Sequence, residues 1–372
     1  MIRMENNRID KLLMPRYCLA LNTIVKQMDG LNDIQQFREK FEKKFCTFVG
    51  GKHALAVNSG TDGLQLALLA LGIGKGDEVI VPDLTYVSTA LVVNYVGATP
   101  IPVDVKRDDL TIDETLIEKA INSTTKAIIA VHMFGHPCNV IALRSIAKRH
   151  GLFLIEDACQ AFGSEYKGKM VGTEGDFGVF SFSYYKPLSS LGGNGGMLIF
   201  REKKFAATIT KYLELWDADP RHLNARFKFN RISISDLITT QVKFAAVSHI
   251  CGSRLNIKAF YQKRLANLKG IKVFRDKAGT KSIMENYLIL AENRDALYEY
   301  LRRRDISCDL PYIPIHETSI FDGKNSNSDV FPETKRYYSK GLHLPLYSLM
   351  TEKDADSVVS CVRAFYLKKQ HE

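Results

Sequence analysis

Three polar side chains that could take part in chemistry lie at the ends of short apolar runs. Asp157 follows the run at 152–155, and Ser181 and Lys186 lie around the end of the run at 178–182. Short apolar runs of this kind predict buried strands. Because open α/β sheets usually bind ligands beyond the carboxyl ends of their strands, we expect these side chains to meet at one ligand-binding edge.

The three groups suit one cofactor, pyridoxal phosphate (PLP). The amine of Lys186 could form a Schiff base with the cofactor's aldehyde. The carboxylate of Asp157 could keep the pyridine nitrogen protonated, so that the ring can act as an electron sink. The hydroxyl of Ser181 could donate to the phosphate. The same spacing is equally typical of a buried aspartate at a strand end and a surface lysine beside glycines, so other segments must decide between these interpretations.

A turn of small residues predicts a place for the phosphate. The apolar segment 54–57 meets Ser59, Gly60 and Thr61, and a strongly helical run follows. Free N–H groups and the helix dipole make a helix start an anion site, although serine and threonine are also common N-caps without any ligand. Farther along, Tyr86 lies where the next helix opens, and its ring could stack on a flat cofactor or pack in the core.

The elements that must position these residues alternate between strand and helix across 50–200. Apolar strands are predicted at 79–82, 97–103, 126–131 and 197–200. The alternation is typical of α/β proteins, whose mostly parallel sheet is covered by helices on both faces. A long helix is predicted at 235–250. We predict an N-terminal arm (1–33), a large PLP-binding domain (34–251) and a smaller α+β domain (252–372).

Composition excludes several classes of protein. The chain has 372 residues, 45% of them hydrophobic, which supports a sizeable core. No apolar run approaches the roughly 20 residues of a membrane span, and we expect no signal peptide. The seven cysteines are spread out and form no CxxC pair, which favours a reducing cytoplasm over a disulfide framework or a metal site. The net charge of +10 is diffuse, so we expect no nucleic-acid partner, whereas a phosphorylated substrate is compatible with it.

Several segments together carry a resemblance to a known family. They are the turn 58–61, the strand–helix unit 72–89, the Glu-Asp-Ala-Cys-Gln-Ala segment 156–161, the Ser-Phe-xxx-Lys segment 181–186, and the C-terminal segments 312–316 and 344–347. From roughly residue 35 to 367 the chain resembles the DegT/DnrJ/EryC1/StrS family of PLP-dependent sugar aminotransferases. The resemblance implies a fold-type I PLP transferase with a seven-stranded, mostly parallel sheet.

The resemblance implies roles for the residues around the cofactor ring. Lys186 would bind the cofactor covalently and move the proton during transamination, and Asp157 would pair with the pyridine nitrogen. Gln160 would lie near the ring and its O3′, and Tyr86 would stack on the ring face. With less weight, Tyr312 and His316 are candidates for contacts with the substrate.

The resemblance also implies how the phosphate would be held. The turn at Gly60, the amides of Thr61 and Asp62, and the Ser181 hydroxyl would bind it, and the Asp62 carboxylate would turn away because it would repel an anion. In the family an asparagine from the second subunit completes the phosphate site, which implies a homodimer. Asn230 is the candidate here.

The implied activity is transfer of an amino group from L-glutamate to a keto-sugar carried on a nucleoside diphosphate, in amino-sugar biosynthesis. A transaminase for a keto-cyclitol or a keto-sugar phosphate is an alternative. Related dehydratases carry a histidine in place of the lysine, so Lys186 argues against dehydration. A non-catalytic regulator or scaffold of the same fold is a further alternative, but it would not need Asp157, Gln160, Ser181 and Lys186 together.

Overall fold

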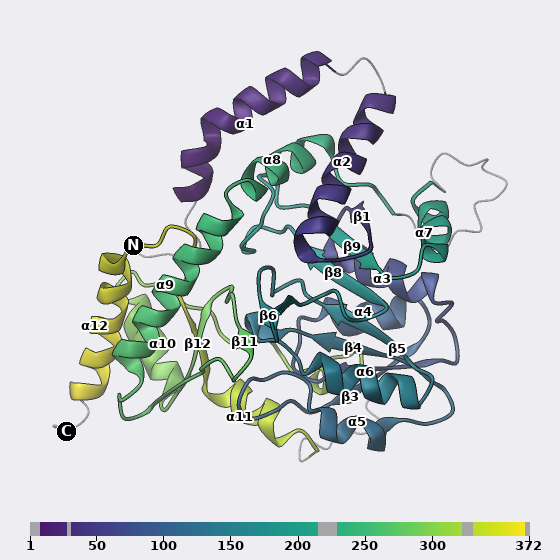
Figure 1. Cartoon of the computed structure of the whole chain (residues 1–372). Helices are drawn as coiled ribbons and strands as arrows, with labels where there is room; N and C mark the ends of the chain where they lie inside the picture. Colours follow the sequence, from purple (N-terminus) through teal and green to yellow (C-terminus); the bar gives the residue numbers. More distant parts are fainter. Residues whose placement is uncertain (1–7, 28–30, 215–228, 322–329, 369–372) are drawn as a thin grey trace.

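A seven-stranded sheet forms the centre of the larger structural unit in the computed structural model (Figure 1). The structure describes residues 8–27, 31–214, 229–321 and 330–368. In spatial order its strands are β1 (His53–Val57), β9 (Gly196–Phe200), β8 (Phe177–Ser181), β5 (Phe153–Asp157), β4 (Thr125–Val131), β2 (Glu78–Pro82) and β3 (Thr99–Val103). Neighbouring strands from β8 to β3 are parallel, whereas β9 is antiparallel to both β8 and β1. The predicted mostly parallel sheet is therefore confirmed.

Helices cover both faces of this sheet. One face packs against α3 (Gly60–Ala70), α4 (Ser88–Tyr95) and α7 (Lys204–Glu214), and the other against α2 (Leu31–Val49), α5 (Glu114–Ala120), α6 (Val140–Arg149) and α8 (Ile234–Phe244). Successive strand residues point to opposite faces. In β2, Val79 and Val81 join the core under α3 and α4, whereas Ile80 joins the core under α5 and α6. Both faces are apolar because both are covered.

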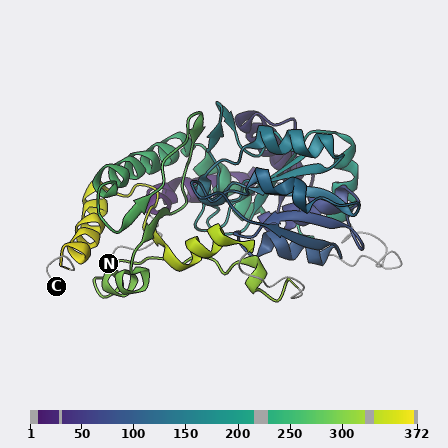
Figure 2. The same ribbon diagram turned by 90° about the horizontal axis from the view of Figure 1, so that it is seen from below.

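A smaller antiparallel sheet forms the second structural unit, at the left of Figure 2. Its strands are β10 (Ile271–Val273), β12 (Tyr287–Ala291) and β13 (Gly341–Leu344), and its helices are α9 (Val247–Leu265), α10 (Arg294–Arg302), α11 (Pro332–Lys340) and α12 (Glu352–Lys368). A third sheet joins β11 (Thr280–Lys281) to the hairpin of β6 (Glu165–Tyr166) and β7 (Lys169–Met170). The predicted boundary at residue 252 falls inside α9, so the domain division stays a prediction.

One predicted helix differs from the structure. The single helix predicted at 235–250 is wrong, because α8 ends at Phe244 and α9 begins at Val247. Both segments have helical sequences, but α8 buries Leu237 against α2, whereas α9 buries Tyr261 in the smaller unit. The segment predicted as an arm contains a helix, α1 (Arg8–Gln27), which lies alongside α8 (Figure 1).

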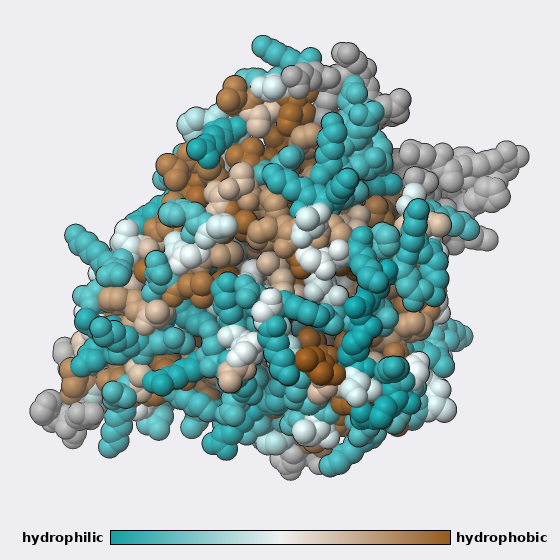
Figure 3. All heavy atoms as spheres, viewed as in Figure 1, coloured by the Kyte–Doolittle hydropathy of each residue, from teal (hydrophilic) through white to brown (hydrophobic). Residues whose placement is uncertain are grey.

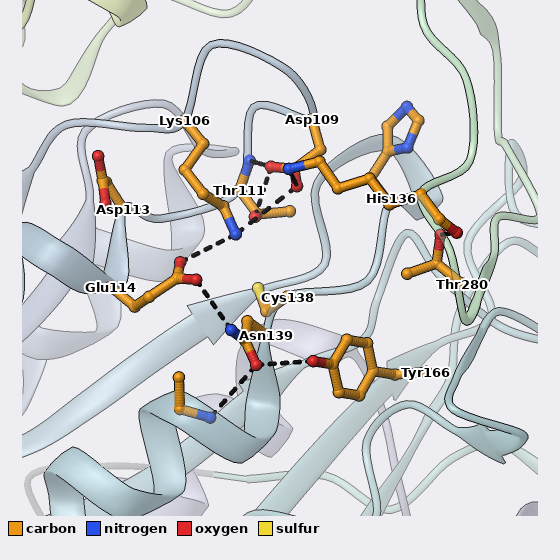
Figure 4. A network of polar contacts seen from close by, with 12 residues as sticks. Lys106, Asp109, Thr111, Asp113, Glu114, His136, Cys138, Asn139, Tyr166 and Thr280 are labelled. Atoms are coloured by element: carbon orange, nitrogen blue, oxygen red, sulfur yellow. Dashed lines mark hydrogen bonds and ion pairs between the residues drawn. The ribbon is translucent and has the colours of Figure 1, made fainter.

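A polar network ties the connection after β3 to α5, α6 and β6 (Figure 4). The Lys106 amine lies 2.9 Å from Glu114 Oε2 and 3.6 Å from Asp109 Oδ2. Asn139, the N-cap of α6, donates to Glu114 Oε1 and accepts a hydrogen bond of 2.7 Å from Tyr166. These contacts fix the start of the helix that follows β4.

Hydrophobic side chains are unevenly distributed on the surface shown in Figure 3. They gather toward the upper left of this view, over α1 and α8, whereas hydrophilic side chains dominate over α2 and in the lower part. On α1, Leu12 and Leu19 are exposed. None of the helices in the described part of the chain combines the length and the hydropathy that a bilayer crossing requires.

Candidate active site

A cavity of about 480 Å³ lies at the edge of the sheet where its parallel strands end. It brings together most of the residues predicted from the sequence: Gly60, Thr61, Tyr86, Asp157, Gln160, Ser181, Lys186 and Tyr312. Asp62, Asn230 and His316 do not line it. A second cavity, of about 540 Å³, lies between the end of α2 and the hairpin of β6 and β7, and it contains none of the predicted residues.

The Asp157 carboxylate at the end of β5 is held by donors from two elements. Its Oδ2 accepts a hydrogen bond of 2.9 Å from the hydroxyl of Thr89 in α4, and its Oδ1 accepts one of 3.1 Å from the backbone N–H of Cys159. Thr89 in turn accepts from the hydroxyl of Thr85, because its own proton goes to the carboxylate. Asp157 therefore has a fixed orientation at the wall of the cavity.

The neighbouring carboxylate, Glu156, points to the opposite face of β5 and has a structural role. It is fully buried and lies 2.9 Å from His132 Nε2. The His132 Nδ1 accepts from the backbone N–H of Cys138, so Nε2 carries the proton that is donated to Glu156. Burial raises the pKa of the Glu156 carboxyl. His132 and the amides of Gly172 and Gly175 lower this pKa by a larger amount, so it lies below its ordinary value. Of the two adjacent acids, only Asp157 faces the cavity.

The N-terminus of α3 forms a narrow cup beside Ser181. A Cβ added to Gly60 would lie 2.6 Å from the sulfur of Cys159 and 3.2 Å from Ser181 Cβ, so only glycine allows this approach. The N–H groups of a first helical turn have no intrahelical acceptor. The Asp62 amide, however, already donates to Ser59 Oγ at 3.0 Å. The donors that remain for a phosphate are therefore those of Gly60 and Thr61.

Lys186 extends into the cavity and is held by an acid that the sequence analysis missed. Its amine donates to Glu285 Oε2 at 2.8 Å, and the two side chains are only 12% and 8% exposed. Glu285 lies just before β12, in the smaller unit. The buried guanidinium of Arg254 donates to the backbone carbonyls of Met284 and Glu285, which fixes this segment. The Lys186 side chain is thus positioned from both structural units.

Two aromatic rings and an amide form the far wall of the cavity. Gln160 accepts from the Phe134 N–H at 3.1 Å, and its amide nitrogen lies 3.5 Å from the Tyr312 hydroxyl. The ring of Tyr312 packs edge-on against Tyr86 at a centroid distance of 5.6 Å. Burial raises the pKa of Tyr312 above its usual value, so its hydroxyl stays protonated. Tyr86 is 51% exposed, so much of its ring is free to contact a ligand.

The remaining predicted residues lie outside this cavity. His316 is buried, its Nδ1 is 2.7 Å from Asp83 Oδ2, and its ring stacks on Phe331. This contact anchors the segment that carries Tyr312 to the end of β2, so His316 supports the cavity without facing it. Asn230 is exposed, two residues before Ile232, which packs near Gly195 in the connection that follows Lys186.

The donor set fits PLP in each of its parts. The carboxylate of Asp157 suits a protonated pyridine nitrogen, and the amine of Lys186 suits an aldehyde. The cup formed by Gly60, Thr61 and Ser181 offers backbone N–H groups and a hydroxyl to a phosphate. Tyr86 provides an aromatic face for the ring.

Comparison with known proteins gives an independent view of the same chain. A sequence model of the DegT/DnrJ/EryC1/StrS aminotransferase family matches residues 22–363. A dTDP-3-amino-3,4,6-trideoxy-alpha-D-glucose transaminase from Streptomyces venezuelae is 33% identical over 326 residues, which cover 87% of this chain and 86% of the relative.

Solved structures with the same fold cover almost the whole chain. DesV of S. venezuelae, solved in complex with a ketimine intermediate, superposes with a TM-score of 0.89 at 31% identity and 98% coverage of both chains. An aminotransferase of the same family from Brucella abortus superposes with a TM-score of 0.90 at 30% identity, over 98% of this chain and 100% of the other.

Proposed function

This chain belongs to the DegT/DnrJ/EryC1/StrS aminotransferase family, and from that premise we propose that it uses PLP to transfer an amino group from L-glutamate to a keto-sugar linked to a nucleoside diphosphate. The S. venezuelae relative is named for a dTDP-linked amino sugar, which supports a substrate of this class. The net charge of +10 is compatible with a substrate that carries two phosphates.

The observation that carries the proposal is the convergence of Lys186, Asp157 and the α3 N-terminus on one cavity. Bound there, PLP would supply an electron sink for the bonds at the amino carbon. Asp157 would hold a proton on the pyridine nitrogen, and Gly60, Thr61 and Ser181 would bind the phosphate. Lys186 would move the proton between substrate carbon and cofactor carbon, because its amine faces the cavity.

The proposal predicts a change of colour in the purified protein. With PLP the protein is expected to be yellow, and L-glutamate is expected to bleach it as the amino group is transferred and 2-oxoglutarate is released. Absorbance spectra before and after addition measure both steps. If the protein stays colourless with added PLP, the proposed PLP-dependent activity is refuted. If the protein is yellow but does not bleach, only L-glutamate is excluded as the donor.

The acceptor can be identified with the bleached protein. Keto-sugar nucleotides are expected to restore the yellow colour, because they would accept the amino group in the second half-reaction. Keto-sugar phosphates and keto-cyclitols serve as the comparison. If only keto-sugar phosphates or only keto-cyclitols restore the colour, the protein is a transaminase, but its substrate belongs to a different class from the one proposed.

The seven unpaired cysteines support a reaction in the reducing cytoplasm.

A homodimer with Asn230 in the partner's phosphate site is part of the same proposal. Asn230, Tyr86 and Tyr184 are all exposed, and Tyr86 and Tyr184 lie around the cavity, where a second subunit could cover them. Replacing Asn230 by alanine is expected to weaken PLP binding by about tenfold, the value of a hydrogen bond to a charged group. Equilibrium dialysis with PLP measures the change.

A hybrid dimer tests whether Asn230 acts across the interface. Mixing Asn230→Ala subunits with Lys186→Ala subunits creates one site in which Lys186 and the partner's asparagine are both intact. Wild-type affinity should return in about half of the sites of such a hybrid. If the affinity of the mixture equals the average of the two parents, Asn230 does not complete the partner's site.

A further inference from the structure

The connection that follows Lys186 is held by one face of α8. Three hydrogen bonds join them: the Lys243 amine donates to Ser189 Oγ at 2.8 Å, the Leu191 N–H donates to Thr239 Oγ1 at 3.1 Å, and the Gly192 N–H donates to Asp236 Oδ1 at 2.9 Å. Asp236, Thr239 and Lys243 lie on one side of the helix because they are three and four residues apart. The face of α8 is thus a platform for the segment that carries Lys186.

Lys243 is the unusual member of this platform, because its ammonium is buried. Its side chain is 1% exposed, and burial lowers its pKa from the ordinary value. Its amine lies 2.6 Å from Asp10 Oδ1, which belongs to α1. An unpaired ammonium in such a place would be strongly destabilising. Lys243 can therefore hold Ser189 only while Asp10 supplies the compensating charge.

Asp10 is in turn held in place by the packing of α1. The hydroxyl of the fully buried Tyr17 donates to Asp10 Oδ1 at 2.8 Å. Ile9, Leu13 and Tyr17 form an apolar cluster with Ile250 of α9. The packing of α1 thus determines where Asp10 lies. The side chain of Lys243 connects Asp10 to Ser189.

We propose that α1 positions the cofactor lysine, because Asp10 neutralises Lys243 and Lys243 orders the segment that follows Lys186 through Ser189. Asp10, Lys243 and Ser189 are positioning residues, since none of them lines the cavity. The expected effect of this coupling on PLP retention rests on the proposed function. The coupling between α1 and the segment that follows Lys186 does not depend on that function.

Asp10→Asn tests the coupling in the full-length, cofactor-free protein. The asparagine can still accept from Tyr17, but it leaves the buried ammonium without a counter-charge. Amide hydrogen exchange at 188–193 is expected to become at least about tenfold faster, and PLP is expected to leave the loaded protein about tenfold faster. Asp356→Asn is the matched control, because it makes the same change at an exposed ion pair with Arg264 and should alter neither rate.

Two further variants separate positioning from a general loss of stability. Ser189→Ala removes the contact but leaves Lys243 paired, so faster exchange at 188–193 is expected while α1 keeps its protection. The double variant Asp10→Asn/Lys243→Met removes the uncompensated charge, so the Tm should recover whereas the fast exchange and fast PLP loss remain.

Either of two results would overturn the inference. One is unchanged exchange at 188–193 in both Asp10→Asn and Ser189→Ala. The other is a double variant in which the exchange rate recovers together with the Tm, which would indicate a purely structural ion pair. If the wild-type protein fails to bind PLP, the proposed function fails, but the exchange measurements still test the coupling.

Discussion

Replacing Lys186 by alanine is expected to abolish transamination, with a loss of kcat on the order of 10⁴-fold or more. Under the proposed function, the variant would lack both the amine that would bind the cofactor covalently and the group that would move the proton. No other lysine lines the cavity formed by the described residues, so none is placed to substitute. Steady-state kinetics with L-glutamate, together with borohydride reduction and mass spectrometry to find the covalently bound cofactor, measure the effect.

Two controls separate chemistry from folding in this experiment. Lys186→Ala removes the counter-ion of Glu285, which is 8% exposed, so the variant is also expected to lose stability. Lys186→Arg keeps a positive charge near Glu285 and should recover the Tm without the activity. Lys204→Ala changes a lysine that is 67% exposed and should alter neither property. Activity above about 1% of wild type in Lys186→Ala would exclude the assigned role.

Sequence patterns predict those strands and turns whose structure is determined by residues close together in the chain. The apolar run before Asp157 predicts a buried strand, and the parallel sheet then brings the ends of β5 and β8 to one edge, where Asp157 and Ser181 both line the cavity. The small residues at the start of α3 predict the cup in the same way. These inferences succeed because strand direction alone fixes which side chains meet.

Contacts between distant segments could not be predicted in this way. Glu285 is 99 residues from Lys186, and Thr89 is 68 residues from Asp157. Nothing in the residues around Glu285 marks it as a partner for a lysine, because the contact depends on how the smaller unit packs against the large sheet. The role of His316 was also ambiguous, since a histidine in a polar turn could face either the cavity or a buried acid such as Asp83.

The N-terminal helix shows a different limit of pattern reading. Among the side chains of α1 whose burial is described, the buried apolar ones are Ile9, Leu13 and Tyr17, and most of the others are exposed. Their spacing of four is helical, but a stripe this narrow resembles an arm without fixed structure. Lys243 of α8 pairs with Asp10 of α1. From the sequence, a lysine of this kind would be expected on a solvent-exposed helix face. Only the three-dimensional contact with Asp10 explains why a lysine can be buried there.

Replacing Asp157 by asparagine is expected to lower kcat by about 10³-fold while the fold is retained. The introduced side chain would be nearly the same size, and its amide oxygen could still accept from Thr89 or Cys159. Under the proposed function, the variant would lack the negative charge that would hold a proton on the pyridine nitrogen. Removal of one electrostatic group from an active site typically lowers the rate by about 10²–10³-fold. Single-turnover bleaching by L-glutamate measures the step directly.

Asp176, which directly precedes β8, offers a matched control for this substitution. Asp176 accepts a hydrogen bond of 2.9 Å from the Leu154 N–H at the opposite end of β5, and it does not line the cavity. Asp176→Asn makes the same chemical change beside the same strand, keeps an acceptor for that N–H, and should leave the bleaching rate within about twofold of wild type. If Asp157→Asn bleaches as fast as Asp176→Asn, the charge of Asp157 does not assist the reaction. If both variants are slow, the effect comes from β5 itself and not from the carboxylate at its end.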